Sequence, residues 1–348
     1  MRRVFLLRNE GVLCLALMNF AFDRTAAATA WRRLICERDS SSSHSSANAS
    51  RTIVGIGDDA AVLTNGMSNG AGELLVTVDM LMEGVHFNDP PASPTEIGRK
   101  SLAVNLSDIA AMGGVPTEAF VSIALPRSRG SEWSIEFLDG IAGLAREFDV
   151  RIAGGDTNIW NGPLVVSITM HGRTQSPAAI LRSGAKPGDW LMVTGQLGGS
   201  LSGRHLNFTP RVKEAQHLMQ RVVLHSMLDL SDGLSTDLPR LAVASQVGFV
   251  VEARSIPIHA DVDPRLPPEI RLAHAMSDGE DFELLFCVTP ADGARLLSDP
   301  TCAPWLSHIG EATAESGVMH LRHPDGRLSP WQRTGYEHRF VDDVAEGA

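Results

Sequence analysis

The sequence predicts an α/β (α+β) protein of two domains, with mixed sheets flanked by helices. Short runs rich in β-branched residues alternate with longer alanine-rich stretches of helical periodicity. The alternation starts again after a polar turn rich in glycine and proline at residues 183–189. A length of 348 residues is also what two domains would require.

The composition is that of an ordinary globular protein with an acidic surface. Apolar residues make up 43% of the chain and charged residues 20%. Aromatic residues contribute only 5%, so the core must be mainly aliphatic and rich in alanine. The net charge of −11 argues against a nucleic-acid partner or an anionic membrane surface, and it fits acidic groups that meet cations.

Residues 1–52 are expected to form an N-terminal extension. Its apolar run Val12–Met18 follows three arginines, so a signal peptide is one interpretation. The run is too short to cross a bilayer and no clear cleavage site follows, which favours an extension upstream of a start at Met18. Residues 19–38 predict an amphipathic helix, and the serine-rich residues 40–50 predict a linker.

The cysteines indicate a reducing, cytoplasmic setting rather than a zinc site. None forms a C-x-x-C pair, and no histidines have the H-E-x-x-H spacing. Isolated thiols behave as small hydrophobic side chains in such a compartment. The residues concerned are Cys14, Cys36, Cys287 and Cys302.

Both predicted domains contain strands and helices. The first domain is expected at residues 53–176 and the second at 177–340, followed by a tail at 341–348. In the first domain, strands are predicted at 74–78, 118–125 and 164–170, and helices at 95–112 and 131–148. In the second, strands are predicted at 190–194, 248–251 and 283–288, and helices at 211–221 and 236–244.

Six acidic sites share one pattern, in which an acid ends an apolar run or lies beside glycine. Loops at the ends of strands are where ligands usually bind in open α/β sheets, and glycine lets backbone N–H groups approach phosphate. Carboxylates repel phosphate but can hold it through Mg²⁺, which prefers oxygen ligands. Several aspartates therefore suggest more than one Mg²⁺ bridging a polyphosphate. The sites are GIGDD at 55–59, TVD at 77–79, NLSD at 105–108, GGDT at 154–157, DLSDG at 229–233 and GED at 279–281.

Each of these acids also has a purely structural interpretation. Asp59 and Asp232 could be turn residues, and Ser231 or Asp232 could cap the helix that follows. Asn105 and Asp108 are three residues apart on a predicted helix and share a face, although Asn105 could also be a surface amide. The loop at 194–200 could wrap phosphate, but a plain strand-to-helix turn is at least as consistent, and the chain has no P-loop motif.

The order of these motifs resembles the thiamine-monophosphate kinase family, part of the superfamily that includes aminoimidazole ribonucleotide synthetase. The resemblance covers about residues 53–340. Its most specific segments are GIGDDAAVL at 55–63, KSLAVNLSDIAAMGG at 100–114, GGDTN at 154–158, RSGAKPGD at 182–189, LDLSDGLSTDL at 228–238 and GEDFELLF at 279–286.

The resemblance implies a two-domain aminoimidazole ribonucleotide synthetase-like fold and a homodimer that pairs N-terminal sheets. It implies transfer of the γ-phosphoryl group from ATP, as co-substrate, to thiamine monophosphate, with several Mg²⁺ ions. The implied magnesium ligands are Asp59, Thr77, Val78, Asp79, Asp108, Asp156, Asp229 and Asp232, among which Asp59, Asp108, Asp156 and Asp229 would be catalytic.

The same resemblance implies contacts with the two substrates. ATP would contact Gly155, Asp156, Arg182 and Ser231, and an arginine is suited to clamping phosphate oxygens. Thiamine monophosphate would contact His86, Glu280 and Tyr336. Val78 stands where threonine is common in the family, so a metal contact there would use its backbone carbonyl.

Two other functions remain as alternatives. One is a different ATP-dependent member of the superfamily, such as a ring-closing synthetase or a hydrogenase-maturation ATPase. The D-x-L-x-E-G-x-H-F run at 79–87 favours the kinase over these enzymes. The other is a non-catalytic nucleotide-binding regulator, which would be expected to have lost several of the acids.

Overall fold

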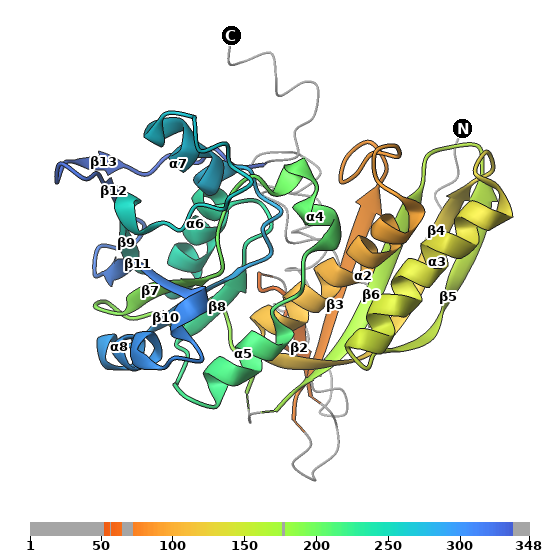
Figure 1. Ribbon diagram of the computed structural model, residues 1–348. Helices are drawn as coiled ribbons and strands as arrows, with labels where there is room; N and C mark the ends of the chain where they lie inside the picture. Colours follow the sequence, from red (N-terminus) through yellow and green to blue (C-terminus); the bar gives the residue numbers. More distant parts are fainter. Residues whose placement is uncertain (1–51, 56, 65–71, 176–177, 337–348) are drawn as a thin grey trace, which may run out of the picture.

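A computed structural model describes residues 52–336 except 56, 65–71 and 176–177. Figure 1 shows two sheets, each flanked by helices, and this confirms the predicted fold class. The predicted N-terminal helix, the serine-rich linker and the C-terminal tail lie outside the described residues. Within the described residues, no helix is long and apolar enough to cross a membrane.

The first sheet has six strands in the order β1-β2-β3-β6-β4-β5. Strand β3 pairs antiparallel with β6, which pairs antiparallel with β4, whereas β5 pairs parallel with β4 at the edge. A parallel neighbour requires a crossover, which helix α3 (Gly130–Glu147) provides. The strands are β1 (Thr52–Val54), β2 (Ala61–Leu63), β3 (Leu74–Met82), β4 (Gly114–Pro126), β5 (Arg151–Trp160) and β6 (Val165–Thr174).

Helix α2 (Pro94–Ala111) is the central helix of the molecule. Its start is fixed by a capping box, in which Ser93 accepts from the N–H of Glu96 at 3.3 Å and Glu96 accepts from the N–H of Ser93 at 2.9 Å. It packs on β3, β4, β6 and α3, and also on α4, α5 and β8 of the second half. Every residue from Lys100 to Ala111 is therefore buried, including five polar ones.

The second sheet has seven strands in the order β13-β12-β9-β11-β7-β10-β8. They are β7 (Trp190–Thr194), β8 (Ser226–Asp229), β9 (Gly248–Glu252), β10 (Leu284–Val288), β11 (Leu306–Thr313), β12 (Met319–Arg322) and β13 (Leu328–Pro330). The helices are α4 (Arg204–Asn207), α5 (Val212–Met219), α6 (Leu234–Ser245), α7 (Pro268–Ser277) and α8 (Pro290–Ser298), with short 3₁₀ turns at Ser200–Ser202, Ala253–Ser255 and Ala303–Trp305.

One hydrophobic core is continuous across the two halves. Side chains alternate between the two faces of a strand, so Met192 and Phe286 of the second sheet reach the same core as Leu106 of α2. The intervening residues Leu191 and Leu285 reach a second core on the opposite face, under α6 and α7. The strands β7, β8 and β10 of the second sheet are consequently buried on both faces.

The helices and strands predicted from residue 53 onwards are all present. The main difference concerns β5, because the GGDT run at 154–157 lies inside this strand and not in a loop after a strand. Asp79 is likewise inside β3, three residues before its end, and not at a strand terminus. Asp79 and Asp156 therefore both lie within strands of the first sheet. The distance between them is set by the strands that lie between β3 and β5.

Candidate functional site

Three of the predicted aspartates meet in one buried cluster. Asp59 precedes β2, Asp108 lies on α2 and Asp229 ends β8. A carboxylate oxygen from each lies within 4.8 Å of the other two, and all three side chains are buried. Such a group of oxygens can hold a hard divalent cation.

Neighbouring side chains hold each carboxylate in place. The hydroxyl of Thr77 donates to Asp108 Oδ2, and the hydroxyl of Ser107 donates to Asp229 Oδ2 at 2.5 Å. The guanidinium of Arg182 donates to both oxygens of Asp59, at 2.5 and 3.2 Å. Arg182 was expected to clamp phosphate; in this structure its partner is an acid of the cluster.

Burial and mutual repulsion make negative charge unfavourable on the carboxylates of the cluster. Burial raises the pKa of Asp108 and of Asp229 well above the usual range, and the charge of Asp59 raises both further. Burial, and then neighbouring acids, raise the pKa of Asp58 and of Asp79 to about 7. A divalent cation bound by these carboxylates would relieve the same repulsion.

Asp79, Asp232 and Val78 lie beside this cluster. The backbone N–H of Asp79 donates to Asn105 Oδ1 at 3.3 Å, and Glu280, Asp232 and Asp59 are close enough to raise its pKa. Arg240 donates to Asp232 Oδ2 at 2.6 Å. Val78 is half-buried within β3, and since its side chain is a hydrocarbon, only its backbone carbonyl could offer a ligand atom.

The residues expected to contact thiamine monophosphate also lie together. His86 Nδ1 accepts from the N–H of Met82 at 3.0 Å, which fixes its ring. Glu280 and Asp232 both influence the half-exposed Tyr336, because burial and then these two charges raise the pKa of its hydroxyl. Ser231, an expected ATP contact, is linked to this group because its carbonyl accepts from the N–H of Glu280 at 2.6 Å.

Gly155 and Asp156 do not join the cluster. Asp79 is aligned with Gly155 through β6 and β4, so three strand spacings, or about 14 Å, separate them. Asp156 is exposed and accepts from Asn158 Nδ2 at 3.0 Å. Gly155 has φ +150° and a Cβ there would lie 1.9 Å from the carbonyl oxygen of Val121, so close packing of β5 on β4 requires glycine.

The glycine-rich loop at 194–200 has its backbone donors already occupied. The N–H of Gly198 donates to Asp281 at 3.0 Å, and the N–H of Gly199 donates to Asp278 at 2.7 Å. These N–H groups face carboxylates, so the loop is a turn tied to the GED segment. Since these two N–H groups already bind carboxylates, they do not support the interpretation that the loop wraps phosphate.

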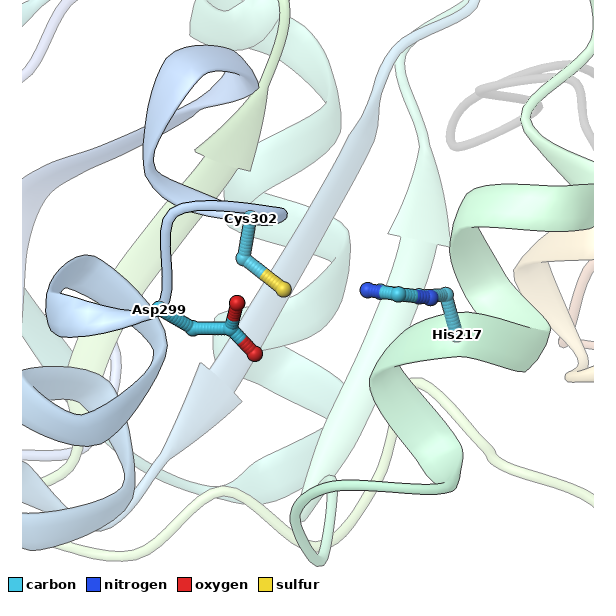
Figure 2. Close-up of side chains that lie close together, drawn as sticks. All are labelled: His217, Asp299 and Cys302. Atoms are coloured by element: carbon cyan, nitrogen blue, oxygen red, sulfur yellow. The ribbon is translucent and has the colours of Figure 1, made fainter.

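The described residues contain a second group of potential metal ligands, shown in Figure 2: His217, Asp299 and Cys302, whose ligand atoms lie within 4.8 Å of one another. The hydroxyl of Thr301 already donates to Asp299 at 2.6 Å and lies 3.0 Å from His217 Nε2. Arg221 donates to the other oxygen of Asp299 at 2.7 Å. Because a guanidinium already neutralises the carboxylate, this group is a hydrogen-bonded tie between α5 and the turn after α8.

The sequence interpretation missed Lys100, Asp58, Asp237 and Arg240. The sequence marks Lys100 only as the single basic residue of the stretch 100–112, which does not reveal its partners. Asp237 accepts from the N–H of Asp232 at 2.9 Å and pairs with Arg240 at 2.5 Å, so these two residues orient the DLSDG loop. Their role depends on contacts that spacing alone does not reveal.

Comparison with protein-family models assigns both halves to one family. Residues 57–174 match the N-terminal domain of AIR synthase related proteins, and residues 186–321 match the C-terminal domain. The two matches together span most of the chain and contain the whole aspartate cluster.

Curated relatives share substantial identity with this chain. Thiamine-monophosphate kinase of Rhodopirellula baltica is 43% identical over 278 residues, which is 77% of this chain and 86% of the relative. The Bacillus subtilis enzyme of the same name is 39% identical over 313 residues, covering 82% and 93%. The Escherichia coli enzyme is 34% identical over 308 residues, covering 82% and 91%.

Several solved structures share the fold of this chain. The thiamine-monophosphate kinase of Stenotrophomonas maltophilia has 31% identity and a TM-score of 0.66, covering 89% of this chain and 98% of that one. AaThiL complexed with AMPPCP and TMP has 24% identity and a TM-score of 0.72, covering 92% and 100%. Hydrogenase maturation protein HypE in complex with ATP, at 19% identity and a TM-score of 0.61 over 75% and 85%, shares the fold.

Proposed function

The chain belongs to the thiamine-monophosphate kinase family of AIR synthase related proteins, and we propose that Asp59, Asp108 and Asp229 form the centre of its reaction. The family's reaction transfers the γ-phosphoryl group of ATP to the phosphate of thiamine monophosphate and gives thiamine diphosphate and ADP. The convergence of three buried carboxylates carries the proposal. Their chemistry suits Mg²⁺.

The acceptor is already an anionic phosphate, so the reaction needs no strong general base. The difficulty is to bring two anions together, and positioning and electrostatic stabilisation supply most of the catalysis in phosphoryl transfer. When bound, Mg²⁺ would neutralise the charge of the polyphosphate. Its ligands would be carboxylates of Asp59, Asp79, Asp108, Asp229 and Asp232, with the hydroxyl of Thr77 and the carbonyl of Val78.

Arg182 and Ser231 would contact ATP from opposite sides of the cluster. Arg182 lies in the segment that enters the second half, and its guanidinium is buried on Asp59. Since a guanidinium binds carboxylate and phosphate in the same bidentate geometry, it can exchange one for the other. Ser231 lies beside Asp232 in the DLSDG loop, within reach of the same centre.

A homodimer would give Gly155 and Asp156 a role. Strand β5 is an edge strand and all ten of its residues are exposed, among them Ile152, Ile159 and Trp160. An exposed apolar edge strand is normally covered by another element. A second copy of the chain that pairs N-terminal sheets would cover β5 and place its GGDT segment in an interface.

A direct assay tests the proposed function. Purified protein with ATP, Mg²⁺ and thiamine monophosphate should yield equal amounts of thiamine diphosphate and ADP, and chelation of Mg²⁺ should abolish both products. ADP without thiamine diphosphate would indicate another ATPase of the superfamily. Absence of both products from folded protein would indicate a non-catalytic regulator.

A further inference from the structure

Lys100 is among the largest fully buried side chains in the described part of the chain, and the proposed reaction has not yet given it a role. It lies in the second turn of α2 with none of its surface exposed. A buried ammonium is costly unless it is paired and hydrogen-bonded. Lys100 therefore needs hydrogen-bond acceptors at its buried position, and the identity of these acceptors indicates the role of Lys100.

All three N–H donors of Lys100 Nζ are used. They reach the carbonyl oxygen of His86 at 2.7 Å, Nδ1 of His205 at 2.8 Å and the carboxylate of Glu280. These acceptors lie 14, 105 and 180 residues away in the chain. One ammonium thus joins the loop after β3, helix α4 and the GED segment.

The GED segment needs such a restraint because its backbone is strained. Glu280 has φ +57° and Phe282 has φ +51°, values that residues other than glycine rarely adopt. Strained conformations persist where the surroundings hold them, and they cluster at functional sites. Phe282 is held by stacking on Phe208, with ring centroids 4.2 Å apart, whereas the side chain of Glu280 is held by Lys100 and lies near His205.

We propose that Lys100 is a positioning residue for the phosphate acceptor, because it binds both the backbone carbonyl of His86 and the carboxylate of Glu280, two residues expected to contact that acceptor. This proposal rests on the function proposed above. The three hydrogen-bond partners of Lys100 are His86, His205 and Glu280, which are not members of the Asp59–Asp108–Asp229 cluster. Its loss should therefore affect thiamine monophosphate much more than ATP.

Lys100→Met provides the test, since it keeps the length of the side chain and removes the charge. We expect the KM for thiamine monophosphate to rise about tenfold or more, while the KM for ATP stays within about twofold. Lys213→Met is the matched control, because it makes the same substitution at an exposed lysine on α5. The control should leave both KM values unchanged.

The double variant Lys100→Met/Glu280→Gln separates positioning from folding. Removing Lys100 alone takes the ammonium partner away from the partly buried carboxylate of Glu280, and this can prevent folding. Neutralising Glu280 removes that charge, so the double variant should regain stability yet keep the high KM of Glu280→Gln. Equal rises in both KM values, or a further tenfold loss on adding Lys100→Met to Glu280→Gln, would contradict action through Glu280.

Calorimetric titration of thiamine monophosphate without ATP gives a readout independent of turnover. Lys100→Met should weaken this binding as much as it raises KM. Unchanged binding in a folded variant would overturn the role of Lys100. If the wild-type protein itself neither binds nor phosphorylates thiamine monophosphate, the proposed function fails instead, so the two failures are distinguishable.

Discussion

Asp59, Asp108 and Asp229 bring three carboxylates into a space from which water is largely excluded. The sequence predicted these residues because each belongs to a motif in which an acid ends an apolar run or lies beside glycine, and because these motifs resemble those of the kinase family. It could not predict Lys100, whose acceptors depend on contacts as distant as 180 residues. It also grouped Asp156 with the cluster, because motif order carries no information on strand order.

Asp108→Asn should reduce kcat by about 100-fold or more, since a metal would lose a charged ligand from a buried site. The fold should survive, because the amide is isosteric and Thr77 can still donate to its oxygen. Steady-state rates at saturating Mg²⁺ and circular dichroism check this result. Asp325→Asn, an exposed change in the hairpin between β12 and β13, is the control. A near-normal rate for Asp108→Asn would argue against a metal role.

The stability of the metal-free protein should depend on pH in an unusual direction. Burial raises the pKa of Asp58 and Asp79 to about 7, above the value of 3.8 expected when unfolded. The folded state therefore binds more protons between these values, and stability is lost as pH rises through about 7. We expect a lower Tm at pH 8 than at pH 6 in a chelator, and a smaller difference with Mg²⁺. A Tm that rises with pH in the chelator would contradict this.

At the scale of elements, the local sequence pattern predicted many of the helices and strands but did not predict the exposed edge strand β5. Helix α2 has a capping box and a long apolar run, and both can be read from the sequence. Strand β5 contains two adjacent glycines and an acid, and it is a strand because β4 pairs with it along its whole length. Such non-local pairing overrides weak strand propensity.

Ile159→Glu should convert a dimer into a monomer, because it places a charge on the apolar edge strand that the second copy would cover. Ile135→Glu on α3 is a close control, since Ile135 and Ile159 are both 59% exposed. Light scattering coupled to size exclusion measures the mass of each variant. A wild-type monomer, or equal dissociation by both variants, would exclude pairing through β5.

At the scale of the whole molecule, the two predicted halves share one core. Sequence pattern predicted the second start near residues 183–189, but it could not show that Met192 and Phe286 pack with Leu106. That contact depends on which face of the second sheet meets α2. The boundary at about residue 177 consequently divides the topology and not the hydrophobic core.

Leu106→Ala should destabilise both halves at once, by about 2–5 kcal/mol, because it opens a cavity in the shared core. Calorimetry should show one transition for the wild type and one, at lower temperature, for the variant. Val243→Ala on α6, at a position that is 67% exposed, should change little. Two separate transitions, with only one shifted, would show that the halves unfold independently.

The ion pair between Arg182 and Asp59 has a consequence for how ligands would bind, because each of the two charged groups could exchange its present partner for a ligand of the same charge. In the structure the arginine is the internal counter-ion of an acid 123 residues away. If Asp59 held a divalent cation, the guanidinium of Arg182 would be free to bind an incoming phosphate, and the negative charge of Asp59 would remain neutralised throughout. The cation and the nucleotide should therefore bind cooperatively, and each should bind more weakly in the absence of the other.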